Sequence, residues 1–200
     1  MADDDARRAA WEERYEAGRT GWDRGEASPA ARAWIAVGAV PSGRMLVPGC
    51  GNGHEVLEFA RHGCEVTAVD IAQQPVEALR ARLDEAGLVV DVVHADLMNW
   101  RPEQPFDAIY EQTCLCALDP IYRAAYELRL ATWLKPGGTL FALFMQTGED
   151  GGPPFDCPVP AMRELFDGAR WQWPDELGRI PHPNGLHEEA AALVRRPATA

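Results

Sequence analysis

The residues best placed to do chemistry lie in one stretch, where a glycine loop over residues 49–53 reads Gly-Cys-Gly-Asn-Gly. Glycine lets the backbone approach a ligand at a point where a Cβ atom would collide with it. The helix expected after the loop turns its free N–H groups toward the same ligand. The next strand, residues 66–69, ends on Asp70, whose carboxylate can accept hydrogen bonds from both hydroxyls of a ribose. The stretch predicts half of a nucleoside-binding α/β domain.

The spacing of the loop indicates which kind of nucleoside cofactor is bound. A dinucleotide site spaces its glycines G-x-G-x-x-G, so that a pyrophosphate can sit on the helix N-terminus. Here the third glycine comes one residue early, and Glu55 follows in the first turn of the helix. An acid there competes with phosphate for the positive end of the helix dipole. The loop therefore favours a phosphate-free cofactor with ribose, adenine and an amino-acid tail, which is the chemistry of S-adenosylmethionine (SAM).

Two more acids follow strand-like runs. Asp96 comes after residues 89–95, and Glu111 comes after residues 106–110. Ligands of parallel α/β sheets bind outside the carboxyl ends of the strands. Three acids at consecutive strand ends therefore predict one binding edge, although a single acid at such a place is common on any surface.

The elements that must position these acids alternate along the chain. Strands are expected at 45–47, 66–69, 89–95, 106–110 and 139–145. Helices are expected between most of them, and the one before the last strand turns Ile121, Ala125, Leu128 and Thr132 inward. A tight turn is expected at 135–138, just before the last of these strands. This alternation predicts an α/β fold, a Rossmann-like, doubly wound, mostly parallel sheet.

The last quarter of the chain is less regular. A Gly- and Pro-rich loop at 146–160 has the length of a functional lid or substrate loop. A short helix at 161–166 and strands at 169–173 and 190–195, with a turn at 181–185 between them, predict an antiparallel C-terminal edge strand. We expect a single domain over residues 1–200, with an N-terminal helical lid at 1–40 and the Rossmann-like core at 41–200.

Three large aromatic residues precede the first strand. Trp11 and Tyr15 lie one turn apart on a helix expected over residues 4–17, and Trp22 follows in a glycine-punctuated segment. They could simply pack a helix against the sheet, since such residues are common in cores. As a lid, the same rings would cover a bound ligand and exclude water.

Composition limits the partners. The chain has 19 basic and 31 acidic residues, a net charge of −12. Nucleic-acid backbones and anionic membranes both require a basic face, so neither is expected as a partner. No apolar run has the length of a membrane span, and no signal-peptide pattern is present. Five cysteines without a framework spacing indicate free thiols in the cytoplasm, and no metal site is expected. We expect a monomer.

Taken in order, these residues resemble the thiopurine S-methyltransferase family of class I SAM-dependent methyltransferases. The likeness is strongest to the branch of halide and thiol methyltransferases and its bacterial relatives. The motifs that carry it are W-x3-Y-x6-W-D-x-G at 11–25, L-V-P-G-C-G-x-G-x-E-V at 46–56, V-D-I at 69–71, D-L-x-x-W at 96–100, F-D-x-I-Y-E at 106–111, L-K-P-G-G at 134–138 and G-G-P-P-F at 151–155.

The resemblance implies a role for each matching residue. Those that would hold the cofactor are Trp11, Tyr15, Trp22, Gly49, Cys50, Gly51, Asp70, Ile71, Asp96, Leu97, Glu111 and Gln112. Within this set, Asp70 would hold the ribose hydroxyls, Asp96 the adenine amino group, and Glu111 would lie beside the methionine tail. Those that would face the methyl acceptor are Trp22, Gln112, Cys114 and Phe155.

The sequence departs from plant relatives at two of these positions. Tyr15 stands where they have a tryptophan, and Gln112 stands where they have a tyrosine near the transferred methyl. The second change bears on whether a halide is the acceptor.

Methyl transfer needs alignment and a dry pocket more than it needs an acid or a base. No His–acid pair occurs at an expected strand end, so no acid or base is assigned, and a soft anionic nucleophile fits. Arg19, Arg24 and Arg123 are candidates to attract it.

We therefore expect a SAM-dependent methyltransferase acting on sulfur of a small thiol, sulfide or thiopurine-like compound, or on a related soft anion such as a halide. One alternative is a non-catalytic SAM sensor or partner-binding module on the same fold, although a sensor has less reason to retain the aromatic lid. A dinucleotide oxidoreductase would need the pyrophosphate spacing that the glycine loop lacks.

Overall fold

The computed structural model describes residues 2–197 and divides them between two compact units, Met1–Arg101 and Pro102–Ala200. Each unit carries its own strands and helices. Whether the chain behaves as one domain stays a prediction.

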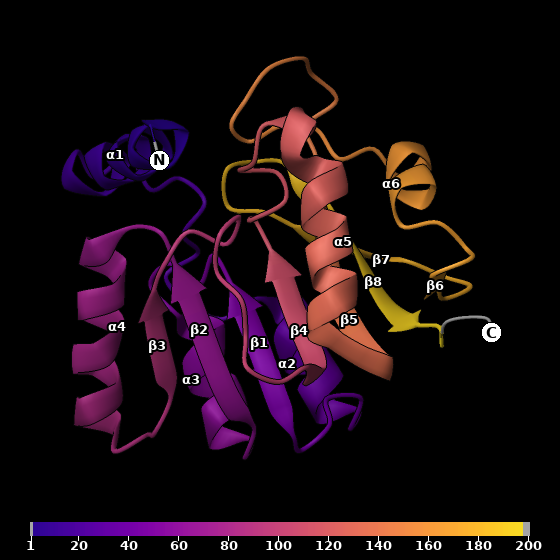
Figure 1. The fold of residues 1–200 in the computed structure, drawn as a ribbon, viewed down its shortest axis with the longest axis horizontal. Helices are drawn as coiled ribbons and strands as arrows, with labels where there is room; N and C mark the ends of the chain where they lie inside the picture. Colours follow the sequence, from indigo (N-terminus) through magenta and orange to yellow (C-terminus); the bar gives the residue numbers. More distant parts are fainter. Residues whose placement is uncertain (1, 198–200) are drawn as a thin grey trace. The chain divides into compact units, whose positions relative to one another are not determined.

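The first unit is a parallel α/β layer (Figure 1). Its strands lie in the order β3-β2-β1, and both pairs are parallel. The elements are α1 (Ala2–Glu16), α2 (Pro29–Ala36), β1 (Arg44–Pro48), α3 (His54–Arg61), β2 (Glu65–Asp70), α4 (Gln73–Ala86) and β3 (Asp91–His94). The register aligns Pro48 with Val69 and Asp70 with His94, so the three strands end at one edge. The glycine loop and Asp70 therefore lie at that edge of the unit.

Local sequence accounts for the helices of this unit. In α2, the Ser28 side chain accepts a hydrogen bond from Ala30 N, and Pro29 occupies the first helical position, as the sequence predicts. In α4, the buried stripe of Val76, Leu79 and Leu83 packs toward β2 and β3, and Gly87 ends the helix in a left-handed conformation.

The second unit is mixed. In it β4 (Phe106–Gln112) pairs in parallel with β5 (Leu134–Gln146), and β5 pairs in antiparallel with β8 (His187–Arg195). Two short strands, β6 (Trp171–Gln172) and β7 (Gly178–Pro181), both pair with β8. The helical elements are η1 (Pro120–Tyr122), α5 (Arg123–Trp133) and α6 (Val159–Leu165). The expected fold class, a mostly parallel sheet with an antiparallel C-terminal edge, is confirmed.

Two local expectations for this unit are wrong. The face of α5 that packs inward consists of Tyr126, Leu130 and Trp133, whereas Ile121 and Leu128 are exposed. The observed stripe buries two aromatic rings, whereas the predicted stripe, which includes Ile121 and Leu128, contains none. The tight turn expected at 135–138 is the start of β5, which pairs with Phe106 through an irregular register.

Candidate active site

The glycine loop follows β1, and its backbone is fixed by conformations that only glycine adopts readily. Gly49, Gly51 and Gly53 have φ values of 60°, 50° and 68°. Cys50 N donates to Val69 O at 3.1 Å, which ties the loop to the end of β2. At Gly53 the reason is also steric, because a Cβ atom there would lie 2.4 Å from Cδ1 of Leu79 on α4.

Asp70 is the buried acid at the end of β2, with 6% of its surface exposed. Its Oδ2 accepts from Gly51 N at 2.8 Å and its Oδ1 from Ala72 N at 2.9 Å. Burial raises the pKa of this carboxyl, while the N–H groups of Ala72 and Gly51 favour its charged form. Each carboxylate oxygen can accept a second hydrogen bond, so Asp70 can still receive two hydroxyl donors.

Asp96, after β3, is held from the N-terminal helix. Arg7 Nη2 lies 2.7 Å from Asp96 Oδ2, and Met98 N donates to Asp96 Oδ1 at 2.8 Å. Only 17% of the Arg7 side chain and 9% of the Asp96 side chain are exposed. The acid expected to meet the adenine amino group therefore also anchors α1.

The three lid aromatics form one cluster within the first unit. Trp22 packs edge-on against Trp11 and Tyr15, with ring centroids 5.4 and 5.5 Å apart. The Tyr15 hydroxyl lies 3.0 Å from the position of a Cβ atom built on Gly51. Burial, and then the charge of Asp70, raise the pKa of Tyr15, which stays a neutral phenol. The cluster thus reaches the glycine loop through Tyr15, and that its rings cover a bound ligand stays a prediction.

The segment before α2 is fastened to the same loop. Asp23 accepts from Gly25 N at 2.7 Å, contacts His54 Nε2 at 2.9 Å, and accepts from the Asn52 side chain. Burial raises the pKa of Asp23, but these hydrogen bonds and His54 outweigh it and lower the pKa overall. Ser28 N donates to Glu55 Oε1 at 2.8 Å, so Glu55 holds the backbone of the segment that precedes α2.

These residues fit SAM. A buried carboxylate with spare acceptor capacity stands at the strand end, beside a glycine loop held in left-handed conformations, and the neutral phenol of Tyr15 lies against Gly51 within the aromatic cluster. Ile71 follows Asp70 and is half-buried, and Leu97, beside Asp96, is buried. When bound here, SAM supplies an electrophilic methyl group on a sulfonium.

In the second unit, Glu111 at the end of β4 is fully buried. Its Oε1 accepts from Leu115 N at 2.6 Å, and its Oε2 has no hydrogen-bond partner in the described part of the chain. Burial raises the pKa of Glu111 to about 8; the Leu115 N–H opposes this shift, and the nearby Glu188 adds to it.

Gln112, the last residue of β4, is hydrogen-bonded to a residue of its own strand and to a residue of β8. Tyr110 donates its hydroxyl to Gln112 Oε1 at 2.7 Å, and Gln112 Nε2 donates to Glu188 Oε2 at 2.9 Å. The next residue, Thr113, has φ 60°, which is rare for a β-branched residue and occurs mainly at functional sites.

Of the other acceptor-side residues expected in this unit, Cys114 follows Gln112 in the chain and Phe155 contacts the segment after it. Cys114 is buried, two residues beyond Gln112. Phe155 is half-buried and reaches the same segment, because its N–H donates to Cys116 O at 2.7 Å.

The family comparison confirms the resemblance. The family model described as "Thiopurine S-methyltransferase (TPMT)" matches residues 6–177. The chain belongs to this family. It is therefore a SAM-dependent methyltransferase.

Similar proteins of the thiopurine S-methyltransferase family come from plants and bacteria. A probable thiol methyltransferase 2 of Arabidopsis thaliana is 35% identical over 78% of this chain and 70% of its own length. A thiocyanate methyltransferase 1 of Brassica oleracea is 33% identical over the same shares. A thiopurine S-methyltransferase of Pseudomonas fluorescens is 31% identical over 80% of this chain and 82% of its own length.

Solved structures support the fold. A Burkholderia thailandensis 1,6-didemethyltoxoflavin N1-methyltransferase, with that compound and S-adenosylhomocysteine bound, has a TM-score of 0.78 at 24% identity, covering 95% of this chain and 87% of its own. A glycopeptide N-methyltransferase complexed with SAM gives a TM-score of 0.66 at 18% identity, covering 86% and 95%.

Sequence reasoning missed two residues. Glu188 is fully buried in β8, and its period-2 spacing with the buried Ala190 is the signal that could have revealed it. Arg7 gave no signal, because nothing in a polar helix marks which arginine meets a distant acid.

The described residues lack two further features. Among residues 2–197, no group of three or more His, Cys, Asp or Glu side chains is arranged to hold a metal ion. Within the same range, no helix is both long and apolar enough to cross a membrane.

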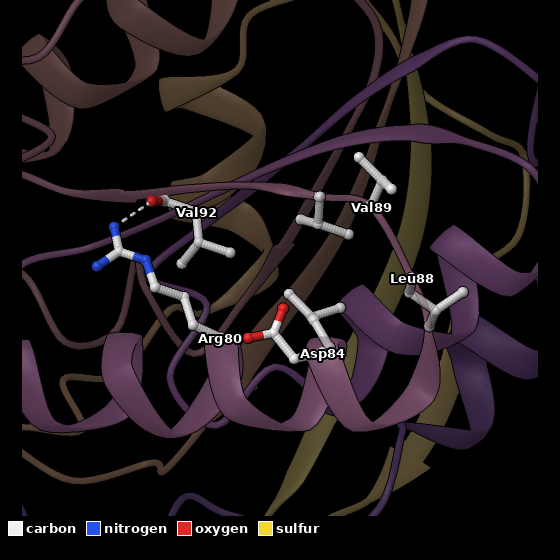
Figure 2. Close-up of a pocket in the computed structure, with 7 residues that line it drawn as sticks. Arg80, Asp84, Leu88, Val89 and Val92 are labelled. Carbon is white, nitrogen blue, oxygen red and sulfur yellow. Dashed lines mark hydrogen bonds between the residues drawn. The ribbon is translucent and has the colours of Figure 1, made fainter.

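A groove of about 390 Å³ lies elsewhere in the first unit, where α4 meets the start of β3 (Figure 2). Arg80 reaches from α4 to donate to Val92 O at 2.6 Å across one end of it. Because it adjoins the amino end of β3 and Asp70 leaves the carboxyl end of β2, the groove is separate from the site.

Proposed function

We propose that this methyltransferase transfers its methyl group to the sulfur atom of a small acceptor, namely a thiol, sulfide or thiopurine-like compound. A soft anion such as a halide is the related alternative. The names of the plant and bacterial relatives support a sulfur acceptor, since they are thiol, thiocyanate and thiopurine methyltransferases.

The observation that carries the cofactor side of the proposal is the buried Asp70, whose two oxygens are oriented by Gly51 N and Ala72 N. We assign it to the ribose, with Gly49 and Cys50 beside the methionine part. Ile71, Asp96 and Leu97 would contact the adenine.

The lid and the second unit supply the remaining roles. Trp11, Tyr15 and Trp22 would exclude water and stabilise the sulfonium by cation–π contact, worth about 0.5–2 kcal/mol. Gln112, Cys114 and Phe155 would face the acceptor. A dry, aligned pocket suffices for in-line displacement at carbon.

The test uses SAM labelled on its methyl group and a panel of iodide, sulfide, an aliphatic thiol and an aromatic thiol. We expect label in a methylated sulfur product. Tight SAM binding in calorimetry with no transfer to any acceptor would instead favour the non-catalytic sensor.

A further inference from the structure

The second unit contains a pair of buried acids, of which Glu111 is expected beside the methionine tail of the cofactor and Glu188 has no role in the reaction described so far. Glu111 on β4 and Glu188 on β8 are both fully buried, and the charge of Glu188 acts on Glu111. Glu188 is linked to Gln112 through the amide Nε2, which approaches its two carboxylate oxygens at 3.2 and 2.9 Å. The acceptor-facing glutamine is therefore anchored on a carboxylate.

Buried polar atoms in this arrangement that have no hydrogen-bond partner among the described residues include Oε2 of Glu111 and Nε of Arg123. The other oxygen of Glu111 accepts the Leu115 N–H, so only Oε2 of this carboxyl is left without a partner there. A buried carboxylate oxygen without a partner is costly, so native structures usually provide one, or a ligand does. The strained Thr113, two residues further, marks the same place.

The charges facing Glu111 do not favour an anion. Arg123, at the start of α5, is the cation that acts on Glu111, and its Nη2 already donates to Asp156 O at 2.8 Å. The surroundings therefore hold one guanidinium, that of Arg123, and two carboxyl groups, those of Glu111 and Glu188. The other titratable groups that interact with Glu111 are uncharged when protonated: Cys116, Cys157 and Tyr126. A halide or thiocyanate ion would lose its water here without gaining a net positive surrounding.

We propose that Glu111 is the proton acceptor for a neutral thiol, and that the Glu111–Glu188 pair selects acceptors with an S–H bond over preformed inorganic anions. This inference rests on the proposed function and names its substrate class. It also disfavours the soft-anion alternative, since a base has no role toward an acceptor that carries no proton.

The step balances. The thiol S–H bond breaks, and its proton passes to Glu111 Oε2. The thiol sulfur uses the released electron pair to form the bond to the methyl carbon, and the pair of the old carbon–sulfonium bond stays on S-adenosylhomocysteine. The proton then leaves to solvent, which restores the carboxylate.

The pKa of Glu111 is close to the pKa of an ordinary thiol. Burial, with Glu188 adding to it, raises the pKa of Glu111 to about 8, and an unperturbed thiol titrates at roughly 8.5. Proton transfer between groups of similar pKa is nearly free of thermodynamic cost, which is the condition for efficient general-base catalysis. An ordinary glutamate would be too weak a base for a thiol.

The main test compares acceptors in Glu111→Gln. Glutamine keeps the shape, and its oxygen can still accept the Leu115 N–H. We expect kcat/KM for an aliphatic thiol to fall at least about 100-fold, the usual effect of losing a general base. Activity with thiocyanate and with an arenethiol already ionised at the assay pH should change less than about threefold, because neither has a proton to give.

A matched control is Glu127→Gln. Glu127 is buried in the same unit but bonds to Trp171 Nε1, at 2.5 Å, and to Arg170. The Glu127→Gln substitution should leave the ratio of aliphatic thiol to thiocyanate activity unchanged. If both variants lower all acceptors equally, the effect of Glu111 is structural and the inference is overturned.

A second variant and a second readout guard against misfolding. Glu188→Gln removes a charge that raises the pKa of Glu111, so the acid limb of the kcat/KM profile for the thiol should move to lower pH. Infrared spectroscopy of the protein without SAM should show a protonated carboxyl near neutral pH that disappears in Glu111→Gln. No shift in the limb, or no such carboxyl, contradicts the proposal.

Other outcomes are distinguishable. Weaker SAM binding by Glu111→Gln in calorimetry, with all acceptors affected alike, would assign Glu111 to the cofactor ammonium instead. A wild-type preference for thiocyanate or iodide over neutral thiols would also overturn the selection. Failure of every sulfur acceptor in the wild type would contradict the proposed function itself.

Discussion

At the scale of single residues, Asp70 supports the strongest prediction. In Asp70→Asn the amide NH₂ must face Gly51 N or Ala72 N, donor against donor, and the charge that ribose hydroxyls would meet is lost. Hydrogen bonds to charged groups contribute about 1.5–3 kcal/mol, so SAM affinity should fall roughly 10- to 100-fold. Isothermal calorimetry measures this directly.

The control for Asp70 is Asp91→Asn, an exposed acid at the start of β3 in the same unit. It should leave SAM affinity within about twofold. Unchanged affinity in Asp70→Asn would remove this residue from the site.

Asp70 was predictable from sequence because its position follows from local rules: a strand, a glycine loop, a helix and a second strand bring an acid to a known edge. The Glu188 carboxylate was not, because its contact with Gln112 spans 76 residues and depends on which strand pairs with β5. Strand alternation could have marked it as inward-facing, but not its partner.

At the scale of elements, the contact between the glycine loop and α4 is testable through Gly53. Gly53→Ala places a Cβ atom against Leu79 at 2.4 Å and also forces φ 68° on alanine. Left-handed strain and overpacking each cost about 1–3 kcal/mol, so the free energy of unfolding should fall by about 2–6 kcal/mol. Urea denaturation measures the loss.

Gly87→Ala separates the two causes. Gly87 has φ 64° at the end of α4, but nothing lies within 4 Å of a Cβ atom built there. It should show the strain alone, and so a smaller loss. Equal losses in the two variants would mean that the Leu79 contact does not matter.

A second prediction at this scale concerns the attachment of α1. Arg7→Gln removes a partly buried ion pair with Asp96, which should weaken docking of α1 by about 1 kcal/mol. Amide hydrogen exchange over residues 4–16 should then be about fivefold faster. Glu13→Gln, which breaks only an exposed pair with Arg19, should leave exchange unchanged.

Elements were predicted well where periodicity and caps agree, as in α2 and α4. The inward face of α5 was wrong because two stripes compete on that helix, and only tertiary packing of Tyr126 and Trp133 decides between them. β7 was missed because its four residues are almost all exposed and carry no hydrophobic pattern. Pairing with β8, and not propensity, makes it a strand.

At the scale of the whole molecule, stability should depend on pH through Glu111. Its pKa of about 8 in the folded chain lies above the ordinary glutamate value of 4.5, so between these values the folded state binds a proton that the unfolded chain lacks. The free energy of unfolding then falls as pH rises, and this contribution is complete below about 4.5 and lost above about 8. One proton gives a slope of at most about 1.4 kcal/mol per pH unit.

The measurement is the difference between wild type and Glu111→Gln, because Glu55, Asp70 and Glu127 also have raised pKa values and contribute to the wild-type slope. Urea unfolding at pH 5.5, 6.5 and 7.5 should show the wild type losing its advantage over the variant as pH rises. Glu164→Gln, an exposed acid on α6, should run parallel to the wild type. A constant difference between wild type and Glu111→Gln would mean that Glu111 is ionised throughout, and it would then be too weak a base to take a proton from a thiol.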